Sequence, residues 1–143
     1  MSEKQDVNPS QKREFLQGKI EQVLYRMNQE GDFKAAIIST LDGFSFASVS
    51  DEFDDVKISA ISAIVQDVSK RAEMYIGFKR MDEVSLVDDD KFRLVCREFV
   101  VGASHFILTV VVPPYKAYRR ITNVALKELE DILQEKHVES KIN

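Results

Sequence analysis

The side chains of this sequence that are best suited to chemistry are two clusters of carboxylates. Asp51, Glu52, Asp54 and Asp55 lie within five residues, and residues 88–90 are a run of three aspartates. Carboxylate oxygens at this density could bind a hard cation. Acidic residues are equally favoured at the start of a helix, and aspartate is common in turns. Because a segment with helical spacing begins at Asp55, we interpret the first cluster as a connector that caps a helix and the second as a turn.

The histidines and the cysteine give little support for catalysis. His105 and His137 are the two histidines and stand far apart, so they form no pair at the spacing of metal ligands. Cys96 is the single cysteine, which excludes an intrachain disulfide. It alternates with Phe92 and Leu94, and no base stands beside it in the sequence. We therefore interpret Cys96 as a small core residue and not as a nucleophile.

Arginine could take part in phosphate chemistry by supplying a finger to a GTPase. Charged side chains mostly lie in solvent, and surface solvation is the simpler interpretation of Arg71, Arg80, Arg119 and Arg120. Neither G-x-x-x-x-G-K-[ST] nor G-x-S-x-G occurs, and the five glycines are scattered, mostly at the expected boundaries of elements. We therefore expect no enzymatic activity, no catalytic residue, no cofactor and no bound metal.

Composition narrows the class of protein further. The net charge is −4 and no basic run occurs, which argues against a nucleic-acid partner. The longest strongly apolar run, 106–112, is far too short to span a bilayer, and the polar N-terminus lacks the apolar region of a signal peptide. We expect a cytoplasmic protein without direct membrane insertion, with one domain at 10–135 between flexible tails at 1–9 and 136–143.

The segment from Asp55 to Ile76 has the spacing of a helix with an unusually broad apolar arc. At about 100° per residue, its apolar side chains span roughly 220°. A helix that lies on one sheet needs a stripe of about 100° or slightly more, so the surplus indicates a second copy or a partner subunit. The alternative is a helix buried in a groove of its own domain. The polar remainder of the surface of this helix consists of Ser59, Ser62, Gln66, Ser69, Lys70 and Glu73.

The rest of the chain predicts two further helices and five short strands. The helices are expected at 10–31, with Ser10 as N-cap and Gly31 as a terminating C′ glycine, and at 115–135. Alternating or β-branched apolar runs predict strands at 33–40, 44–49, 83–88, 91–99 and 105–112. The order is α-β-β-α-β-β-β-α. This order predicts an α+β fold: a five-stranded antiparallel sheet with two helices on one face and the central helix on the other.

Three segments together resemble the roadblock / dynein light-chain family. AAIISTLDGFSFAS at 35–48 is similar to its opening hairpin, ISAISAIVQDVSKRAEMYIG at 58–77 to its central helix, and FRLVCREFVVGASHFILTVVV at 92–112 to its last two strands. The resemblance implies a dimer in which the central helices pack together and the third strands pair. By position, the interface residues would be Ile61, Ile64, Val68, Ala72, Val84 and Leu86. The aromatic return strand and the bulky central helix leave a homodimer and a heterodimer with a paralogue both open.

The resemblance also implies a function. We expect a non-enzymatic dimeric interaction platform that regulates or scaffolds a Ras-like small GTPase. Partner contacts are expected from the polar rim of the central helix, which comprises Ser62, Gln66, Ser69, Lys70 and Glu73. Two alternatives stay open: a small-ligand sensor module with a cavity between helix and sheet, and a structural subunit of a motor or membrane-anchored complex.

Overall fold

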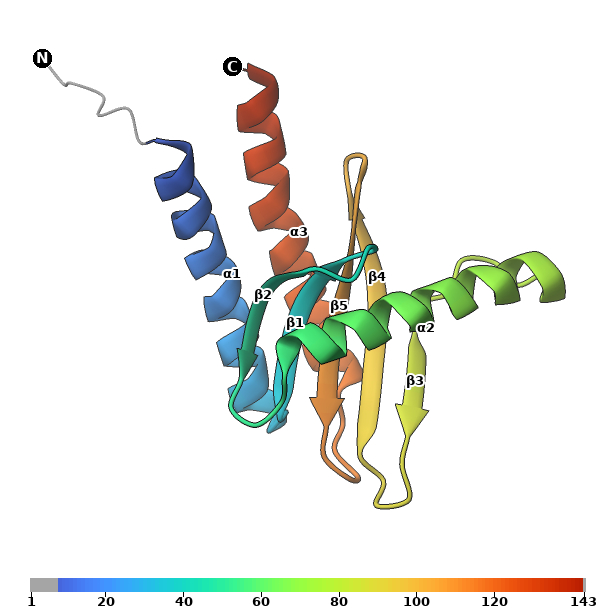
Figure 1. Ribbon diagram of the computed structural model, residues 1–143. Coiled ribbons are helices and arrows are strands. Elements are labelled where there is room, and N and C mark those ends of the chain that lie inside the picture. The colour runs from blue at the N-terminus through green and yellow to red at the C-terminus, as the bar shows by residue number, and fades with distance from the viewer. Residues whose placement is uncertain (1–7, 143) are drawn as a thin grey trace, which may run out of the picture.

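The computed structural model describes residues 8–142, which form one five-stranded antiparallel sheet with helices on both faces (Figure 1). The predicted fold class and the order α-β-β-α-β-β-β-α are confirmed. The elements are α1 (Pro9–Gly31), β1 (Ala35–Thr40), β2 (Ser45–Ser50), α2 (Asp55–Ile76), β3 (Val84–Val87), β4 (Arg93–Val101), β5 (Ser104–Val112) and α3 (Arg119–Ile142).

The strand order across the sheet is β2-β1-β5-β4-β3, so β5 is the central strand, as its continuous apolar sequence predicts. Val110 of β5 lies opposite Ala36 of β1 on one side and opposite Val95 of β4 on the other. β2 and β3 are the two edges of the sheet. Each edge strand has one neighbour within the described chain, and its outer side is unpaired.

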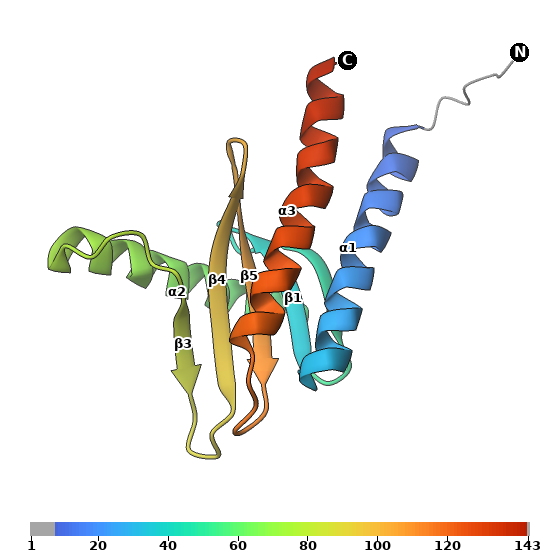
Figure 2. The same cartoon turned by 180° about the vertical axis from the view of Figure 1, so that it is seen from behind.

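Helices α1 and α3 lie side by side on one face of the sheet (Figure 2). Their inward side chains and those of the sheet make one large apolar cluster, in which Leu24, Leu129 and Phe99 are almost completely buried. At the surface, Arg26 of α1 forms an ion pair of 2.7 Å with Glu128 of α3. This cluster is much larger than the one on the other face of the sheet, so it supplies most of the free energy that the domain gains by burying apolar side chains.

The ends of α1 differ from the prediction. The N-cap is Asn8 and not Ser10: the Asn8 side chain accepts from the amide of Gln11, and the Gln11 side chain accepts from the amide of Asn8. Pro9 stands at the first helical position, where its missing N–H is harmless. Gly31 is still helical, and the left-handed residue is Asp32, with a φ of 56°. A Cβ at Gly31 would collide with the Phe33 ring, so glycine serves close packing here.

Helix α3 is shifted towards the C-terminus relative to the predicted range of 115–135. It begins at Arg119 because Pro113-Pro114 and Tyr115, with a φ of 62°, make a turn first. It continues to Ile142, since neither glycine nor proline follows Glu135 to stop it. The predicted tail at 1–9 falls mostly outside the described residues, and Pro9 within it is helical.

Candidate protein-interaction surface

Helix α2 lies alone on the second face of the sheet, and its contact with the sheet is made largely by serines. Ser59 and Ser62 have no exposed surface, and Ser69 is almost as buried. Val65 is the one large apolar side chain that α2 buries fully. The prediction that Ser62 and Ser69 belong to an exposed polar rim is therefore wrong. The prediction that Ser59 lies on the polar surface of this helix is wrong for the same reason.

Burial of Ser62 is tolerated because its hydroxyl finds partners close by, whereas the hydroxyl of Ser59 has none among the described residues. The Ser62 hydroxyl donates to the carbonyl of Ile58, one turn earlier, at 2.8 Å, and lies 2.6 Å from the hydroxyl of Thr109 on β5. Cys96 on β4 is buried beside this pair, and burial raises the pKa of its thiol, which keeps it protonated and unreactive. Small side chains let α2 approach the sheet closely. The close contact of Ser62 and Thr109 leaves no room for a ligand at this point. A hollow of about 590 Å³ does lie between the start of α2 and the sheet, lined by Ile58, Leu86 and Val111 among others, so the sensor alternative stays open.

With the serines turned inward, the large apolar side chains of α2 face outward. We call them the α2 outer face. Ile64 is 61 % exposed, and the neighbouring members are exposed to a similar degree. Contiguous apolar surface of this kind marks an interaction site in soluble proteins. The α2 outer face consists of Val56, Ile61, Ile64, Val68, Met74, Tyr75 and Ile76, and exposed Phe78 extends it past the end of the helix.

The edge strand β3 lies next to the second half of α2, and the end of α2 runs past it (Figures 1 and 2). Leu86 is 50 % exposed and Val87 nearly as much, whereas Val84 is half-buried. One side of β3 pairs with β4, and the other side is free within the described chain. The α2 outer face and this free edge are together referred to as the α2/β3 surface. The residues predicted for a dimer interface lie on it, with Ala72 at its half-buried margin.

A network of charges fixes the segment that leads into β3. Arg119 of α3 binds both Asp82 and Glu83, and the buried Arg97 of β4 binds Asp82 at 3.1 Å. These hydrogen bonds, first from Arg119 and then from Arg97, lower the pKa of Asp82. The hydroxyl of Tyr118 donates to Glu83, and burial together with this bond raises the pKa of Tyr118. Arg119 therefore holds β3 in place, and its guanidinium is not free to act as a finger.

The other members of the predicted polar rim lie where α2 meets β4 and the segment before β3. Gln66 donates to the half-buried Glu98 of β4 at 2.6 Å, and the ammonium of Lys70 is 3.9 Å from the same carboxylate. Glu73 accepts from the amide of Met81. Gln66 and Lys70 thus tie α2 to β4, and Glu73 ties it to the segment before β3. Their role in binding a partner stays a prediction.

The acidic clusters have the capping and turn roles that the sequence predicts. Asp54 is the N-cap of α2 and accepts from the amides of Val56 and Lys57. Asp88 accepts from the amide of Phe92 and closes the turn between β3 and β4. Within residues 8–142, no group of three or more acidic, histidine or cysteine side chains is placed to hold a metal ion. No helix in this part of the chain is long and apolar enough to cross a membrane.

Comparison with known proteins shows what this arrangement is. No family model and no curated protein matches the sequence. Solved structures do match: MglB of Myxococcus xanthus, at 16 % identity and a TM-score of 0.65, covers 97 % of this chain and 94 % of its own. A Roadblock/LC7 domain from Streptomyces avermitilis matches at 12 % identity and a TM-score of 0.67 over 82 % of this chain and 97 % of its own. The chain therefore has the roadblock/LC7 fold.

A second MglB structure supports the same assignment of fold. The gliding protein MglB from Thermus thermophilus matches at 16 % identity and a TM-score of 0.62, over 84 % of this chain and 92 % of its own. The predicted resemblance to the roadblock / dynein light-chain family is thus confirmed at the level of the fold. Identities this low carry no information about individual site residues.

Proposed function

We propose that this protein is a non-enzymatic, cytoplasmic interaction platform that dimerises through the α2/β3 surface and regulates or scaffolds a Ras-like small GTPase. One observation carries the proposal: α2 packs on its sheet through serines and turns its large apolar side chains to solvent. Exposing so much apolar surface is unfavourable for an isolated chain, and covering it is favourable by roughly 25 cal/mol per Å². A partner on this face supplies that gain.

A second copy fits the α2/β3 surface because a two-fold axis would bring identical features together. Two antiparallel β3 edges would pair, and two α2 outer faces would pack on the same side of the joined sheet. The contacts would be made by Ile61, Ile64, Val68, Ala72, Val84 and Leu86. Acidic residues stand on both sides of the short β3, at 82–83 and at 88–90. Such charges limit which strand can pair with an edge, which favours one register. One similar structure, described as MglB with tetrameric arrangement, is an assembly of the same fold.

The small GTPase is proposed from the roadblock resemblance. A dimer of this form would present a broad helical face across two protomers, with Gln66, Lys70 and Glu73 at its margin. Ser62 and Ser69 drop out of the proposed contact set because they are buried. Asp54, Cys96 and Arg119 are engaged in a cap, in core packing and in ion pairs, which favours a binding role over catalysis.

Light scattering of Ile64→Asp tests the dimer. Wild-type protein is expected at twice the mass of one chain, and Ile64→Asp at the mass of one chain, because dimerisation would bury an unpaired charge. Val124→Asp is the matched control: Val124 is 54 % exposed but lies on α3, and this variant should stay dimeric. A wild-type monomer, or an unchanged mass for Ile64→Asp, would overturn the proposed interface.

Titration with purified small GTPases from the same organism tests the partner. Each GTPase is loaded with GDP or with a non-hydrolysable GTP analogue, and binding to wild type and to Ile64→Asp is compared. Binding that prefers one nucleotide state and weakens in Ile64→Asp is expected. Rates of GTP hydrolysis and of nucleotide exchange then separate a regulator from a scaffold. A dimer that binds none of these GTPases in either state would leave the structural-subunit alternative.

A further inference from the structure

The second free edge of the sheet, at β2, lies on the opposite side from β3 and beside α1 (Figure 1). Thr40 of β1 donates its amide to the carbonyl of Phe44 and accepts from the amide of Gly43, so the backbone groups of Thr40 point towards β2. In an antiparallel pair, the N–H and C=O of a residue that does not bond its neighbour both point outward, and such residues alternate. Ile38 and Ala36 therefore bond towards β2 as Thr40 does, and their partners Ala47 and Val49 face β1. The backbone groups of Ser48 and of Ser50 face the open side of β2.

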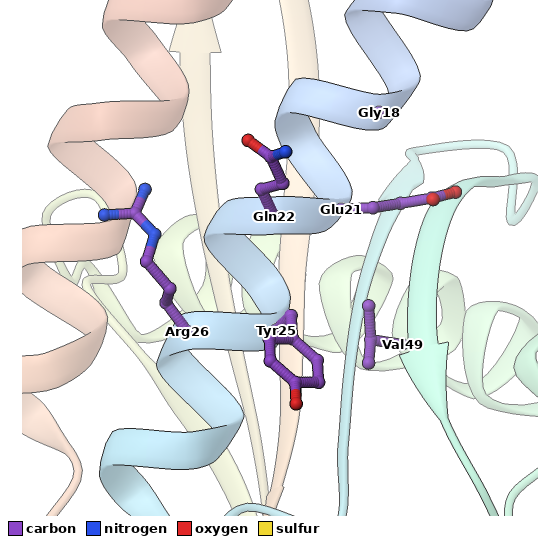
Figure 3. Close-up of a pocket in the computed structure, with 6 residues that line it drawn as sticks. All are labelled: Gly18, Glu21, Gln22, Tyr25, Arg26 and Val49. Carbon is purple, nitrogen blue, oxygen red and sulfur yellow. The ribbon is translucent and has the colours of Figure 1, made fainter.

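A groove follows this open side, between α1 and β2. Its upper part has a volume of about 410 Å³ and is lined by Gly18, Glu21, Tyr25 and Val49 among others (Figure 3). A second hollow of about 320 Å³ also touches Tyr25 and Val49 and continues past them to Asp51 and Glu52. The two hollows thus form one groove beside the unpaired backbone. We call it the α1/β2 groove.

Gly18 has no structural explanation within the described chain. It lies inside α1, where glycine is less favourable than alanine by roughly 0.5–1 kcal/mol. Its φ is not positive, and a Cβ at this position would meet nothing within 4 Å. Folding therefore does not require glycine here. The missing side chain keeps the upper end of the α1/β2 groove open, which is what a chain lying across α1 would need.

The charges around the groove indicate what kind of segment it would accept. Glu21, Asp51 and Glu52 form no ion pair with the described side chains. Arg26, on the same helix, points towards α3 (Figure 3) and is neutralised there by Glu128. Lys34 also lines the second hollow, where Asp51 and Glu52 outnumber it and leave an excess of negative charge. The groove is thus acidic at both ends and apolar at Tyr25 and Val49 in the middle.

From these features we infer that the α1/β2 groove binds an extended, basic segment of a partner protein, which adds to the sheet as a strand beside β2. Backbone hydrogen bonds to Ser48 and Ser50 would supply affinity. Alternate side chains of the segment would point to the groove, so that one apolar residue packs on Tyr25 and Val49. Flanking lysine or arginine residues would meet Glu21 and the pair Asp51 and Glu52. This site is separate from the α2/β3 surface, so each surface can be occupied while the other is.

Selection from a phage-displayed library of random peptides about 12 residues long, with the whole chain as target, tests the inference. The expected sequences alternate apolar residues with lysine or arginine, and their synthetic forms should shift the amide resonances of Ser48 and Ser50 in NMR spectra. Ser48→Pro should weaken binding about tenfold relative to Ser48→Ala, because it removes an N–H that the strand would use. Proline is tolerated on edge strands where the N–H faces solvent, so the fold should survive.

Two further variants complete the test. Gly18→Gln should raise the melting temperature, because glutamine is a better helix former than glycine. It should also weaken peptide binding, because its side chain fills the upper end of the α1/β2 groove. Ile64→Asp, on the other face of the sheet, should leave peptide binding unchanged even where it abolishes the dimer. Selected peptides that lack basic residues, or that bind Ser48→Pro and Gly18→Gln as tightly as wild type, would overturn the inference. Selection without any enriched peptide would overturn it as well.

Discussion

The two faces of the central sheet are packed in opposite ways. On the α1/α3 face, eighteen buried residues form one cluster that includes Leu24, Phe99 and Leu129. On the α2 face, the buried cluster consists of three residues, Val65, Cys96 and Ile107, and serines occupy the rest of the helix–sheet contact. The first face is complete within one chain. The second holds its helix closely but leaves most of the apolar surface of that helix uncovered, and this is the surface that the proposed dimer would cover.

Truncation of one core residue on each side should give the largest difference between the faces. Leu24→Ala removes a completely buried side chain from the α1/α3 cluster, and we expect it to lower the free energy of unfolding by about 2–5 kcal/mol. Ile64→Ala on the α2 outer face should change it by less than about 0.5 kcal/mol in the monomer. Urea unfolding measures both, at a protein concentration low enough for the monomer to dominate. Equal losses would show that α2 has a different orientation in solution.

A larger side chain in the helix–sheet contact should have the next largest effect. Ser62→Leu is the substitution that a hydropathy pattern would favour, since it adds an apolar residue to a buried position. We expect it to destabilise the protein by about 1–3 kcal/mol, because Thr109 lies 2.6 Å from the Ser62 hydroxyl and α2 would have to move away. Ile61→Leu, on the outer face, is the control and should leave the unfolding midpoint unchanged. A stabilised Ser62→Leu would show that this contact is loosely packed.

The sequence predicts the elements better than it predicts their orientation. The bounds of α2 are correct because its ends carry local signals: Asp54 caps the start and Gly77, with a φ of 83°, terminates the helix. β5 is correctly placed in the centre because its apolar run has no polar alternation. The start of α3 is wrong because the turn at Tyr115 depends on a left-handed conformation that a tyrosine seldom adopts.

The orientation of α2 could not be deduced because an apolar arc of roughly 220° can face a sheet with either of its margins. Hydropathy ranks serine as polar and therefore places Ser59, Ser62 and Ser69 outside. It takes no account of the small size of serine, nor of the bond between the Ser62 hydroxyl and the carbonyl of Ile58 one turn earlier, which offsets most of the penalty for burying that hydroxyl. A surplus of apolar surface was thus predictable, but the side on which it is exposed was not.

The charge network beside β3 should give a smaller effect, which depends on pH. Because Arg119 and Arg97 lower the pKa of Asp82 in the folded protein, the stabilisation is present above the unfolded-state pKa of about 4 and is lost as the pH falls through the lower folded-state value. The Asp82 side chain is 67 % exposed, so solvent screening limits the contribution to about 1 kcal/mol or less. Urea unfolding should show Asp82→Asn as less stable at about pH 7 and equal to wild type near pH 2. A gap that is the same at both pH values would assign the effect to packing.

The smallest expected effect distinguishes two serines that share one buried face of α2. The hydroxyl of Ser62 has two hydrogen-bond partners. Ser62→Ala should therefore lower the free energy of unfolding by about 1 kcal/mol, because the Thr109 hydroxyl loses its bond to Ser62. The hydroxyl of Ser59 is equally buried but has no partner among the described residues, so Ser59→Ala removes an unsatisfied group and should be neutral or slightly stabilising. Thermal unfolding of both variants at low protein concentration measures the difference. If Ser59→Ala were the more damaging of the two, the wild-type Ser59 hydroxyl would have to be bonded in solution, for instance to a buried water. The closeness of α2 to the sheet would then depend on that water as well as on the small size of serine.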